Sequence, residues 1–231
     1  AQDAANVAVR VTATEPAALV SGSNVTLKLR GFELKQVTAL RFPAAEQVAV
    51  KILETNDADQ PKGLDNKQVG TTQVVAEFVL PGDIPSGMLE YVLVTPSGEI
   101  SNKIRVIATD AAVDEKEPNN GFRDAQELLS GQSARGAIQS DRDVDVFAFP
   151  VEAGLQFKVH VSSGGPLLAD LALHCYDSQG QLVAAADDDQ TRDPAMTLQA
   201  KSNGNLFLCI SSAHDIGGPW HSYLLTVEEV K

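Results

Sequence analysis

The chain has 231 residues, a length that favours two domains of roughly 100 to 120 residues each. Its 31 acidic residues outnumber its 18 basic ones, and the formal net charge of −13 argues against nucleic acid or an anionic membrane surface as a partner. No apolar run approaches the roughly 20 residues that cross a bilayer, so the sequence predicts no membrane insertion. The small, polar residues 1–6 suit a mature N-terminus left by a signal peptide, and they suit an arbitrary chain boundary equally well.

Short β-branched and aromatic runs separated by turn residues fill residues 7–108, which is typical of a β-sandwich. Val25, Leu27 and Leu29 alternate with polar neighbours, as in a strand with one buried face. Residues 56–70 form a long polar loop in this interpretation. The strands predicted for this half are residues 7–14, 25–30, 39–42, 48–54, 73–80, 89–95 and 103–108.

Several motifs of this half occur together in one known family. They are Glu15-Pro16, Ser21-Gly22-Ser23, Val25-Thr26-Leu27, Leu29-Arg30-Gly31-Phe32, Val79-Leu80-Pro81 and Val94-Thr95-Pro96-Ser97-Gly98. With them, residues 7–108 resemble an immunoglobulin-like IPT/TIG domain. The resemblance implies a β-sandwich with a structural or binding role, and it implies no catalytic residue.

A change in pattern marks the boundary between the two halves. The strand alternation is lost and the charge increases over residues 109–116, which we interpret as a linker. The sequence therefore predicts an Ig-like domain over residues 1–108, the linker, and a second domain over residues 117–231.

After the linker the sequence predicts one short helix and then a second β-sandwich, of jelly-roll type. Asn119 or Asn120 can cap the helix. Its apolar residues would share one face over about two turns: Phe122, Ala125, Leu128 and Leu129. The strands predicted for the sandwich are residues 137–138, 146–151, 156–161, 170–176, 181–185, 195–200, 205–211 and 222–227.

Two oxygen-rich clusters bracket the predicted helix. The first is Glu115-Lys116-Glu117-Pro118-Asn119-Asn120, and the second is Asp141-Arg142-Asp143-Val144-Asp145. Carboxylates and amide carbonyls are the ligands that Ca²⁺ takes in groups of about six to eight, and crowded carboxylates repel one another without a cation. The stretch is therefore a candidate calcium site at the domain junction.

In the second cluster, the alternation of side chains along a strand conflicts with the cost of burying charge. We call this the parity conflict. In an extended segment, Asp141, Asp143 and Asp145 point to the same side as Phe147 and Phe149, which belong in the core. Unpaired buried charge costs several kcal/mol, so all of the aspartates cannot follow the phenylalanines inward. Either the segment before Val146 is a turn with solvated carboxylates, or a cation collects them at the rim of the sandwich.

A second family shares a longer series of motifs with this half. These are residues 115–120, Gly136-Ala137-Ile138, residues 141–147, Ala153-Gly154, Asp170-Leu171-Ala172-Leu173, residues 176–180, Asp187-Asp188-Asp189 and residues 223–227. Residues 115–228 thereby resemble the bacterial pre-peptidase C-terminal domain, a secreted, non-catalytic β-sandwich appended to proteases and other exported proteins. Because some members hold calcium near a Glu-x-Glu-Pro-Asn segment, the resemblance implies a ligand set of Glu115, Glu117, Asn119, Asn120, Asp141, Asp143 and Asp145.

The sequence departs from that family at two places. Val146 stands where a tyrosine commonly follows the last aspartate, so a ligand from that tyrosine is missing. Leu206-Phe207 replaces a frequent Tyr-Tyr pair, which weakens the inference of collagen-type binding.

Two aromatic residues suggest a separate binding surface. Trp220, the only tryptophan, and Tyr223 lie in the segment that enters the last strand, where exposed rings can stack on a sugar or a peptide. The alternative is that Trp220 closes one end of the sandwich.

The remaining polar residues point to no enzyme. Residues 187–189 with Asp193 form an acidic loop that we interpret as a solvated turn, a second cation being the alternative. His214-Asp215 and the nearby serines lack a nucleophile elbow and an oxyanion segment. Cys175 and Cys209 fall on opposite faces if both strands alternate, which argues against a disulfide unless a bulge intervenes.

The sequence therefore predicts an exported, non-catalytic binding or accessory module, stabilised by Ca²⁺ at the interdomain junction. The expected location is secreted, periplasmic or at the cell surface, with an extracellular protein or a polysaccharide as partner. The alternative is a structural spacer or cell-surface assembly unit that has no ligand of its own.

Overall fold

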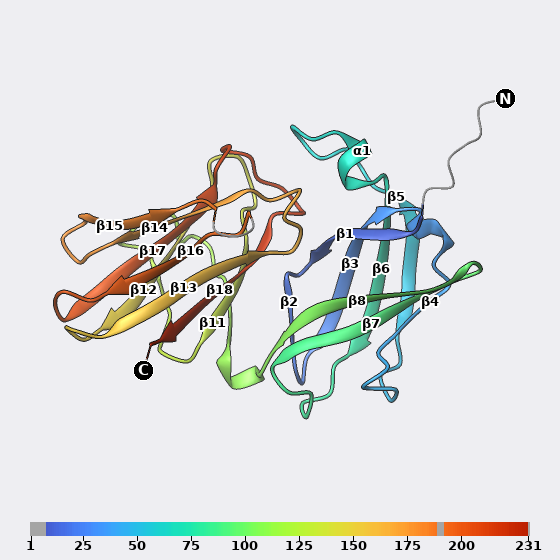
Figure 1. The fold of residues 1–231 in the computed structure, drawn as a ribbon, viewed down its shortest axis with the longest axis horizontal. Coiled ribbons are helices and arrows are strands. Elements are labelled where there is room, and N and C mark those ends of the chain that lie inside the picture. Colours follow the sequence, from blue (N-terminus) through green and yellow to red (C-terminus); the bar gives the residue numbers. More distant parts are fainter. Residues whose placement is uncertain (1–7, 189–191, 231) are drawn as a thin grey trace. The chain divides into compact units, whose positions relative to one another are not determined.

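The computed structural model describes residues 8–188 and 192–230 and confirms the all-β fold class (Figure 1). The chain divides into two units, Ala1–Glu15 with Leu19–Ala108 and Pro16–Ala18 with Thr109–Lys231. Each unit has a hydrophobic core of its own between two β-sheets.

The first unit has the strand order of an immunoglobulin domain. One sheet has the order β1-β3-β6-β5, with bounds Arg10–Glu15, Asn24–Phe32, Thr72–Val79 and Lys51–Asp57. The other has the order β2-β8-β7-β4, with bounds Ala18–Val20, Gly98–Ile107, Gly87–Thr95 and Ala39–Arg41. Lettered along the chain, these sheets are A-B-E-D and A′-G-F-C, the arrangement of Ig-like sandwiches.

The core of this unit follows the alternation of its strands. Val25, Leu27 and Leu29 are buried on β3, as the sequence predicts, and they meet the buried residues of β6, Val74 and Ala76, across the antiparallel pair. The strand β2 has only three residues, which is too short for alternation to reveal. A 3₁₀ turn, η1 (Leu34–Gln36), follows β3.

The predicted loop 56–70 is more ordered than its composition indicates. It contains a short helix, α1 (Asn66–Val69), whose first turn is capped by the Asp65 side chain accepting from the N–H of Lys67 at 2.9 Å. The Arg30 guanidinium of β3, which is fully buried, donates to the carbonyl of Asp59 at 2.7 Å and to that of Gly70 at 2.9 Å. Arg30 therefore fixes the loop at both of its ends.

The second unit also consists of two sheets. The first has the order β10-β12-β17-β14-β15, with bounds Gln126–Glu127, Val144–Val151, Gly204–Ser212, Leu171–Tyr176 and Leu182–Ala186. The second has the order β16-β13-β18-β11-β9, with bounds Ala195–Gln199, Gln156–Ser163, Ser222–Glu229, Ser133–Ala137 and Ala112–Asp114.

The pairing of these strands is nested. The first of the eight main strands, β11, pairs with the last, β18, and further antiparallel pairs β12–β17, β13–β16 and β14–β15 lie inside it along the chain. A long hairpin rolled up in this way is a jelly roll, as the sequence predicts. Phe147, Phe149 and Phe157 lie in its core, and the rings of Phe149 and Phe157 meet edge to face at 5.2 Å.

The prediction of a helix after the linker is wrong, because the segment joins a sheet instead. Residues 121–124 form a turn, and β10 then pairs in parallel with β12. The N–H of Leu128 donates to the carbonyl of Ala148 at 3.0 Å. A helix of only two turns has marginal stability unless tertiary packing supports it. The backbone hydrogen bonds to the edge of β12 therefore stabilise this segment more than a helix would.

The linker predicted over residues 109–116 also has regular structure. It forms a 3₁₀ turn, η2 (Thr109–Ala111), and then the strand β9, which pairs in parallel with β11. A strand of three residues is too short to show a recognisable alternation of apolar and polar side chains, which explains why the sequence resembles a linker there.

The two cysteines are free and buried. In the pairing of β14 with β17, Cys209 lies opposite His174 and Cys175 lies opposite Leu208. The two thiols therefore point to opposite faces of one sheet, as the alternation of the sequence predicts.

We predict that Arg30→Met lowers the stability of the first unit by about 2–4 kcal/mol, because carbonyl groups in the 59–70 loop lose a buried charged donor. Thermal unfolding followed by circular dichroism measures this change. Arg41→Met is the matched control: Arg41 pairs with Glu99 at the surface, where both side chains are 53% exposed, so its loss should cost about 1 kcal/mol or less. Equal losses in the two variants would contradict the proposed role of Arg30.

Candidate metal centre

The first carboxylate of the site is held by the edge strand β9. Because Asp114 is in register with Arg135 of β11, the next residue, Glu115, donates its N–H to the carbonyl of Arg135 at 2.8 Å. The Glu115 Oε2 atom accepts from the N–H of Ala137 at 2.7 Å. Its carboxylate is therefore fixed over the end of β11.

The following residues run beside the start of β12. The peptide bond between Glu117 and Pro118 is cis. The Asn119 N–H donates to Glu117 Oε2 at 3.0 Å, and its carbonyl accepts from the N–H of Val146 at 3.0 Å. These bonds place Glu117 and Asn119 next to the inward-facing side chain of Asp145, the residue before Val146.

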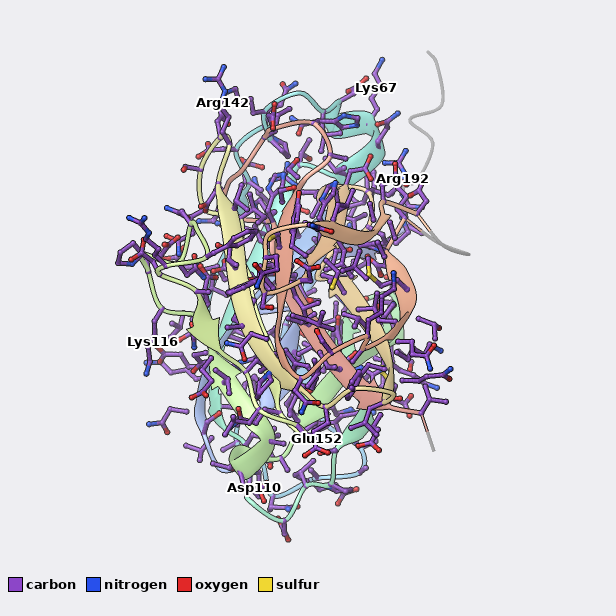
Figure 2. All side chains as sticks on the ribbon, turned by 90° about the vertical axis from the view of Figure 1, so that its left-hand side faces the viewer. Lys67, Asp110, Lys116, Arg142, Glu152 and Arg192 are labelled. Carbon is purple, nitrogen blue, oxygen red and sulfur yellow. The ribbon has the colours of Figure 1, made fainter. Side chains whose placement is uncertain are left out.

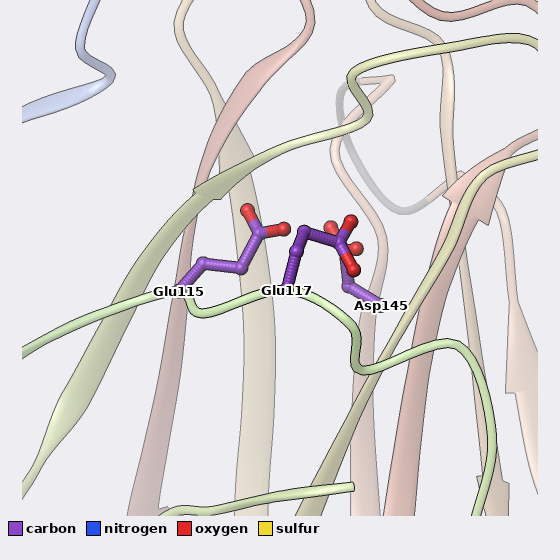
Figure 3. Close-up of side chains that lie close together, drawn as sticks. All are labelled: Glu115, Glu117 and Asp145. Carbon is purple, nitrogen blue, oxygen red and sulfur yellow. The ribbon is translucent and has the colours of Figure 1, made fainter. Parts of the chain in front are cut away.

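The Asp145 side chain is the one that causes the parity conflict noted in the sequence. It shares the inward face of β12 with Phe147 and Phe149 and is fully buried. Figure 3 shows its carboxylate beside those of Glu115 and Glu117, and one oxygen from each of these residues lies within 4.8 Å of the other two. Three carboxylates thus meet at the end of the sandwich, one of them without access to water.

The amide of Asn119 completes the group. Asn119 is fully buried, and the end of its side chain lies 3.3 Å from Glu117 Oε2 and 3.2 Å from Asp145 Oδ1. With its nitrogen turned toward them, the amide donates to both carboxylates. With its oxygen turned toward them, it becomes a fourth oxygen donor of the kind that surrounds a bound cation.

Tyr223 of β18 lies against the same group. It is fully buried beside the Asp145 and Glu115 carboxylates, and among the described residues no well-aligned hydrogen bond satisfies its hydroxyl, Asp145 Oδ2 or Glu115 Oε1. A Cβ atom at Gly136 would collide with both the Tyr223 hydroxyl and Glu115 Oε2, so the backbone of β11 leaves space for them only because residue 136 is glycine. Buried polar atoms without partners are rare and indicate a missing ligand or a stored electrostatic strain.

The electrostatics of the group follow from burial and crowding. Burial, together with the charge of Glu115, raises the pKa of Asp145 to about 8. Burial also raises the pKa of Glu115, against the effect of the hydrogen bond from Ala137. The pKa of Tyr223 lies well above its ordinary value because the ring is buried beside these carboxylates. The cluster therefore favours either a proton or a cation at neutral pH.

The other predicted ligands are not part of this group of oxygens, although Asp143 lies close enough for its charge to act on Asp145 and Glu115. Asp143 Oδ2 accepts from the N–H of Gln139 at 2.7 Å, and the amide of Asn120 lies 3.2 Å from Asp143 Oδ1 and 3.0 Å from the carbonyl of Val144. Asp141 is exposed, and its Oδ1 accepts weakly from the N–H of Gly217 at 3.4 Å. Asp141 and Asp143 belong to a turn before β12, in which Arg142 has a φ of 64° and points outward (Figure 2).

The turn with solvated carboxylates, one of the two alternatives that the sequence left open, accounts for only part of the parity conflict. Asp141 lies on a solvated turn, whereas Asp145 remains on the inward face of the strand. Of the seven predicted ligands, the group brings together Glu115, Glu117, Asn119 and Asp145.

The predicted aromatic surface at Trp220 and Tyr223 needs correction. Trp220 is 7% exposed and Tyr223 is fully buried, so neither ring is presented to a sugar or a peptide. Tyr223 shares the inward parity of Leu225 and Val227 on β18, and all of them lie in the core. That parity is visible in the sequence and could have placed Tyr223 inside the sandwich.

The other polar segments have local roles. Asp193 Oδ1 accepts from the N–H of Ser163 at 2.9 Å and from its hydroxyl at 2.7 Å, and Asp189 lies outside the described residues. His214 Nε2 lies 3.2 Å from Asp170 Oδ2, whereas the Ser212 hydroxyl oxygen accepts from the N–H of His214. The imidazole thus pairs with Asp170, and it is the backbone of His214 that bonds to that serine.

We predict that, in the presence of a chelator, the second unit becomes less stable as the pH rises from about 4 to about 8. An unfolded aspartate has a pKa near 3.9, so in this range the folded form holds a proton on Asp145 that the unfolded form has lost. Each such proton contributes up to about 1.4 kcal/mol per pH unit. Calorimetric melting at several pH values measures the slope.

Asp145→Asn is the control for this pH dependence, because it removes the titrating group while the rest of the acidic chain is unchanged. The difference in melting temperature between the variant and the wild type should widen as the pH rises, in favour of the variant. Parallel curves for the two proteins would show that Asp145 does not carry the effect.

We also predict that Gly136→Ala lowers the stability of the second unit by about 1–3 kcal/mol, because the added methyl group displaces Glu115 or the buried Tyr223. Gly121→Ala is its matched control, since nothing lies within 4 Å of a Cβ atom there. Chemical denaturation of the two variants measures the difference, and equal stabilities would refute the tight packing around Gly136.

Comparison with known proteins adds no family assignment. No family model and no curated protein matches the chain. Among solved structures, the chain is similar to the pre-peptidase C-terminal domain of a collagenase from Bacillus anthracis, with 16% identity, a TM-score of 0.38, and coverage of 49% of this chain and 100% of that one.

Two other similar structures cover nearly the whole chain. SGBP-B of the Bacteroides ovatus mixed-linkage glucan utilization locus, in complex with a mixed-linkage heptasaccharide, has 12% identity and a TM-score of 0.28 over 96% of this chain and 74% of that one. The secreted serine protease VesC from Vibrio cholerae has 11% identity and a TM-score of 0.30 over 97% of this chain and 51% of that one. At these identities and scores, the fold assignment rests on the strand pairing of the chain itself.

Proposed function

We propose that this chain is an exported, non-catalytic binding or accessory module whose jelly-roll unit is stabilised by one Ca²⁺ ion. The ion would be held by Glu115, Glu117, Asn119 and Asp145. The observation that carries the proposal is the fully buried Asp145 carboxylate, which faces further carboxylates and has an oxygen without a hydrogen-bond partner. Burying such a group without a counter-charge costs several kcal/mol.

The donor set fits calcium better than a transition metal. Every side chain of the group offers oxygen, whereas zinc and copper sites in proteins use histidine and cysteine. Calcium takes carboxylate and amide oxygens in irregular arrangements, and water supplies the remaining ligands. The exposed Glu117 at the mouth of the group leaves room for such water molecules.

The ion would act by joining two parts of the fold. Glu115 and Glu117 follow the edge strand β9, and Asp145 belongs to β12 in the opposite sheet. A bound cation replaces the repulsion between them by attraction, and because only the folded form assembles the group, binding stabilises that form by mass action.

The proposed location agrees with this chemistry. Extracellular modules bind calcium with dissociation constants of roughly 10⁻⁴ to 10⁻³ M, which suits the calcium concentration outside cells but not inside them. No helix among the described residues is long and apolar enough to cross a membrane. The sequence shows no nucleophile elbow or oxyanion segment around His214, and the non-catalytic role is proposed on that basis. Hydrolysis of peptides or glycans by the pure protein that is lost in His214→Ala would overturn this part.

We predict that calcium in millimolar excess raises the melting temperature of the second unit relative to the same protein in EGTA. With about 10 mM calcium and a dissociation constant of about 10⁻⁴ to 10⁻³ M, the gain is about 1.4 to 2.7 kcal/mol, which is several degrees for a domain of this size. Magnesium at the same concentration should give a smaller rise, because it requires a regular octahedral site. Differential scanning calorimetry measures both.

Glu117→Gln tests the ligand assignment. Glu117 is exposed, so the variant should melt like the wild type in EGTA and lose most of the rise with calcium. Glu127→Gln is the matched control, an exposed glutamate of the same unit outside the group, and it should keep the full rise. The proposal fails if calcium leaves the wild type unchanged or if Glu117→Gln responds as the wild type does.

A further inference from the structure

The outer face of the sheet β10-β12-β17-β14-β15 carries a row of aromatic side chains. The inward residues of β14 and β17, such as Cys175 and Leu208, lie in the core, so their neighbours along the strands face outward. Those neighbours include His174 and Tyr176 on β14 and Phe207 on β17. Tyr176 lies directly opposite Phe207 in the register of the two strands.

A fourth ring comes from the turn that follows the candidate metal centre. Phe122 stacks on Phe207 with their centroids 4.5 Å apart and their planes at 21°, and its centroid lies 5.4 Å from that of Tyr176. Tyr176 in turn stacks with His174 at 6.5 Å. The four rings form one row, which we call the aromatic row.

Phe122 presents a flat surface to solvent. One face of its ring covers Phe207, yet the side chain is 41% exposed, so the opposite face is open. The turn at Gly180 borders the edge of the ring, since a Cβ atom there would lie 3.5 Å from Phe122 Cε2. An aromatic ring on a surface turn is costly to leave in water unless something else covers it.

Polar hollows lie at both ends of the row. At one end, a hollow of about 360 Å³ is lined by His174, Asp187 and Ser211 among others, which is within the size range of ligand sites. At the other end, a hollow of about 120 Å³ is lined by Gln181, Gln199 and Asn205 among others. Asn205 and Ser211 belong to the same outward face of β17 as Phe207, so each hollow borders the row, and the smaller hollow extends to Gln199 of the other sheet. We call the row together with these two hollows the strip.

We propose that this strip binds a neutral glycan chain. Sugars have flat C–H faces that pack on aromatic rings, and hydroxyl groups around their rims that bind amides, hydroxyls and carboxylates. The strip offers both in alternation: stacked rings in its middle and hydrogen-bonding side chains at its ends. Asp187 in the larger hollow and the net charge of −13 disfavour anionic glycans.

The same features favour a glycan over a proline-rich peptide. Grooves that bind such peptides use aromatic residues to pack against the prolines and need donors for the peptide carbonyls. Phe122 contacts both Phe207 and Tyr176, and neither phenylalanine has a donor. Among these three rings only Tyr176 carries a hydroxyl, and most of the polar side chains lie in the hollows instead.

The inference extends the proposed binding function and names its partner class, but its test is independent of calcium. The isotope-labelled full chain is titrated with cellohexaose, mannohexaose, xylohexaose and chitohexaose, followed by NMR of the backbone amides and by calorimetry. A decaproline peptide is titrated in parallel. Concentrations up to about 5 mM detect dissociation constants in the millimolar range. We expect at least one hexasaccharide to bind and to shift the amides of Phe122, Tyr176 and Phe207.

Variants of the row make the test specific. Phe122→Ala should weaken binding about tenfold or more, as the loss of a central aromatic contact does, and Phe122→Trp should keep it. Leu129→Ala is the matched control, because Leu129 is 45% exposed and lies outside the row. Binding of none of the hexasaccharides, binding of the peptide alone, or full binding by Phe122→Ala would overturn the inference. A calcium-dependent rise in melting temperature would still stand in each case, so the two proposals can fail separately.

Discussion

The burial of the Asp145 carboxylate is the constraint on which this end of the second unit depends. The alternation of β12 sends that side chain inward with two phenylalanines, into a place where a lone charge is not stable. The neighbouring groups do not neutralise it, because they are two further carboxylates, an amide and a phenol. Either a proton or a cation can relieve the charge at neutral pH, because burial raises the pKa of Asp145 to about 8, so occupancy of the group and stability of the fold are linked.

This constraint accounts for several otherwise unrelated features nearby. The short edge strand β9 brings Glu115 to the end of β11, and Gly136 removes the methyl group that would exclude it. The carbonyl of Asn119 accepts from Val146, which ties the segment after Glu117 to the strand that carries Asp145. Each feature alone is ordinary, but together they hold carboxylate oxygens within 4.8 Å of one another, where a proton or a cation reduces the repulsion between them.

The sequence predicted the sheets well because their strands alternate over five or more residues with one buried face. It missed β2, β9 and β10, which have two or three residues each and are defined by hydrogen bonds at sheet edges rather than by a pattern of side chains. It also placed the strand before β12 at residues 137–138, whereas β11 spans Ser133–Ala137. The expected helix failed for the same reason, since residues 126–128 gain backbone partners from β12. At the candidate site, composition and parity identified Asp145 as exceptional, but only the fold shows that Asp141 turns away and that Tyr223 lies against it.

The candidate metal centre and the aromatic row share one segment of chain. Asn119 has its amide among the carboxylates, Asn120 bonds to the turn before β12, and Phe122 stacks on Phe207 two residues later. The turn between them has no regular secondary structure, so its position depends on these side-chain contacts. The segment that enters the carboxylate group is thus the one that carries the Phe122 ring. A ring that is already held in place loses less entropy when a ligand stacks on it, and a fixed metal centre would thereby strengthen binding at a surface that it does not touch.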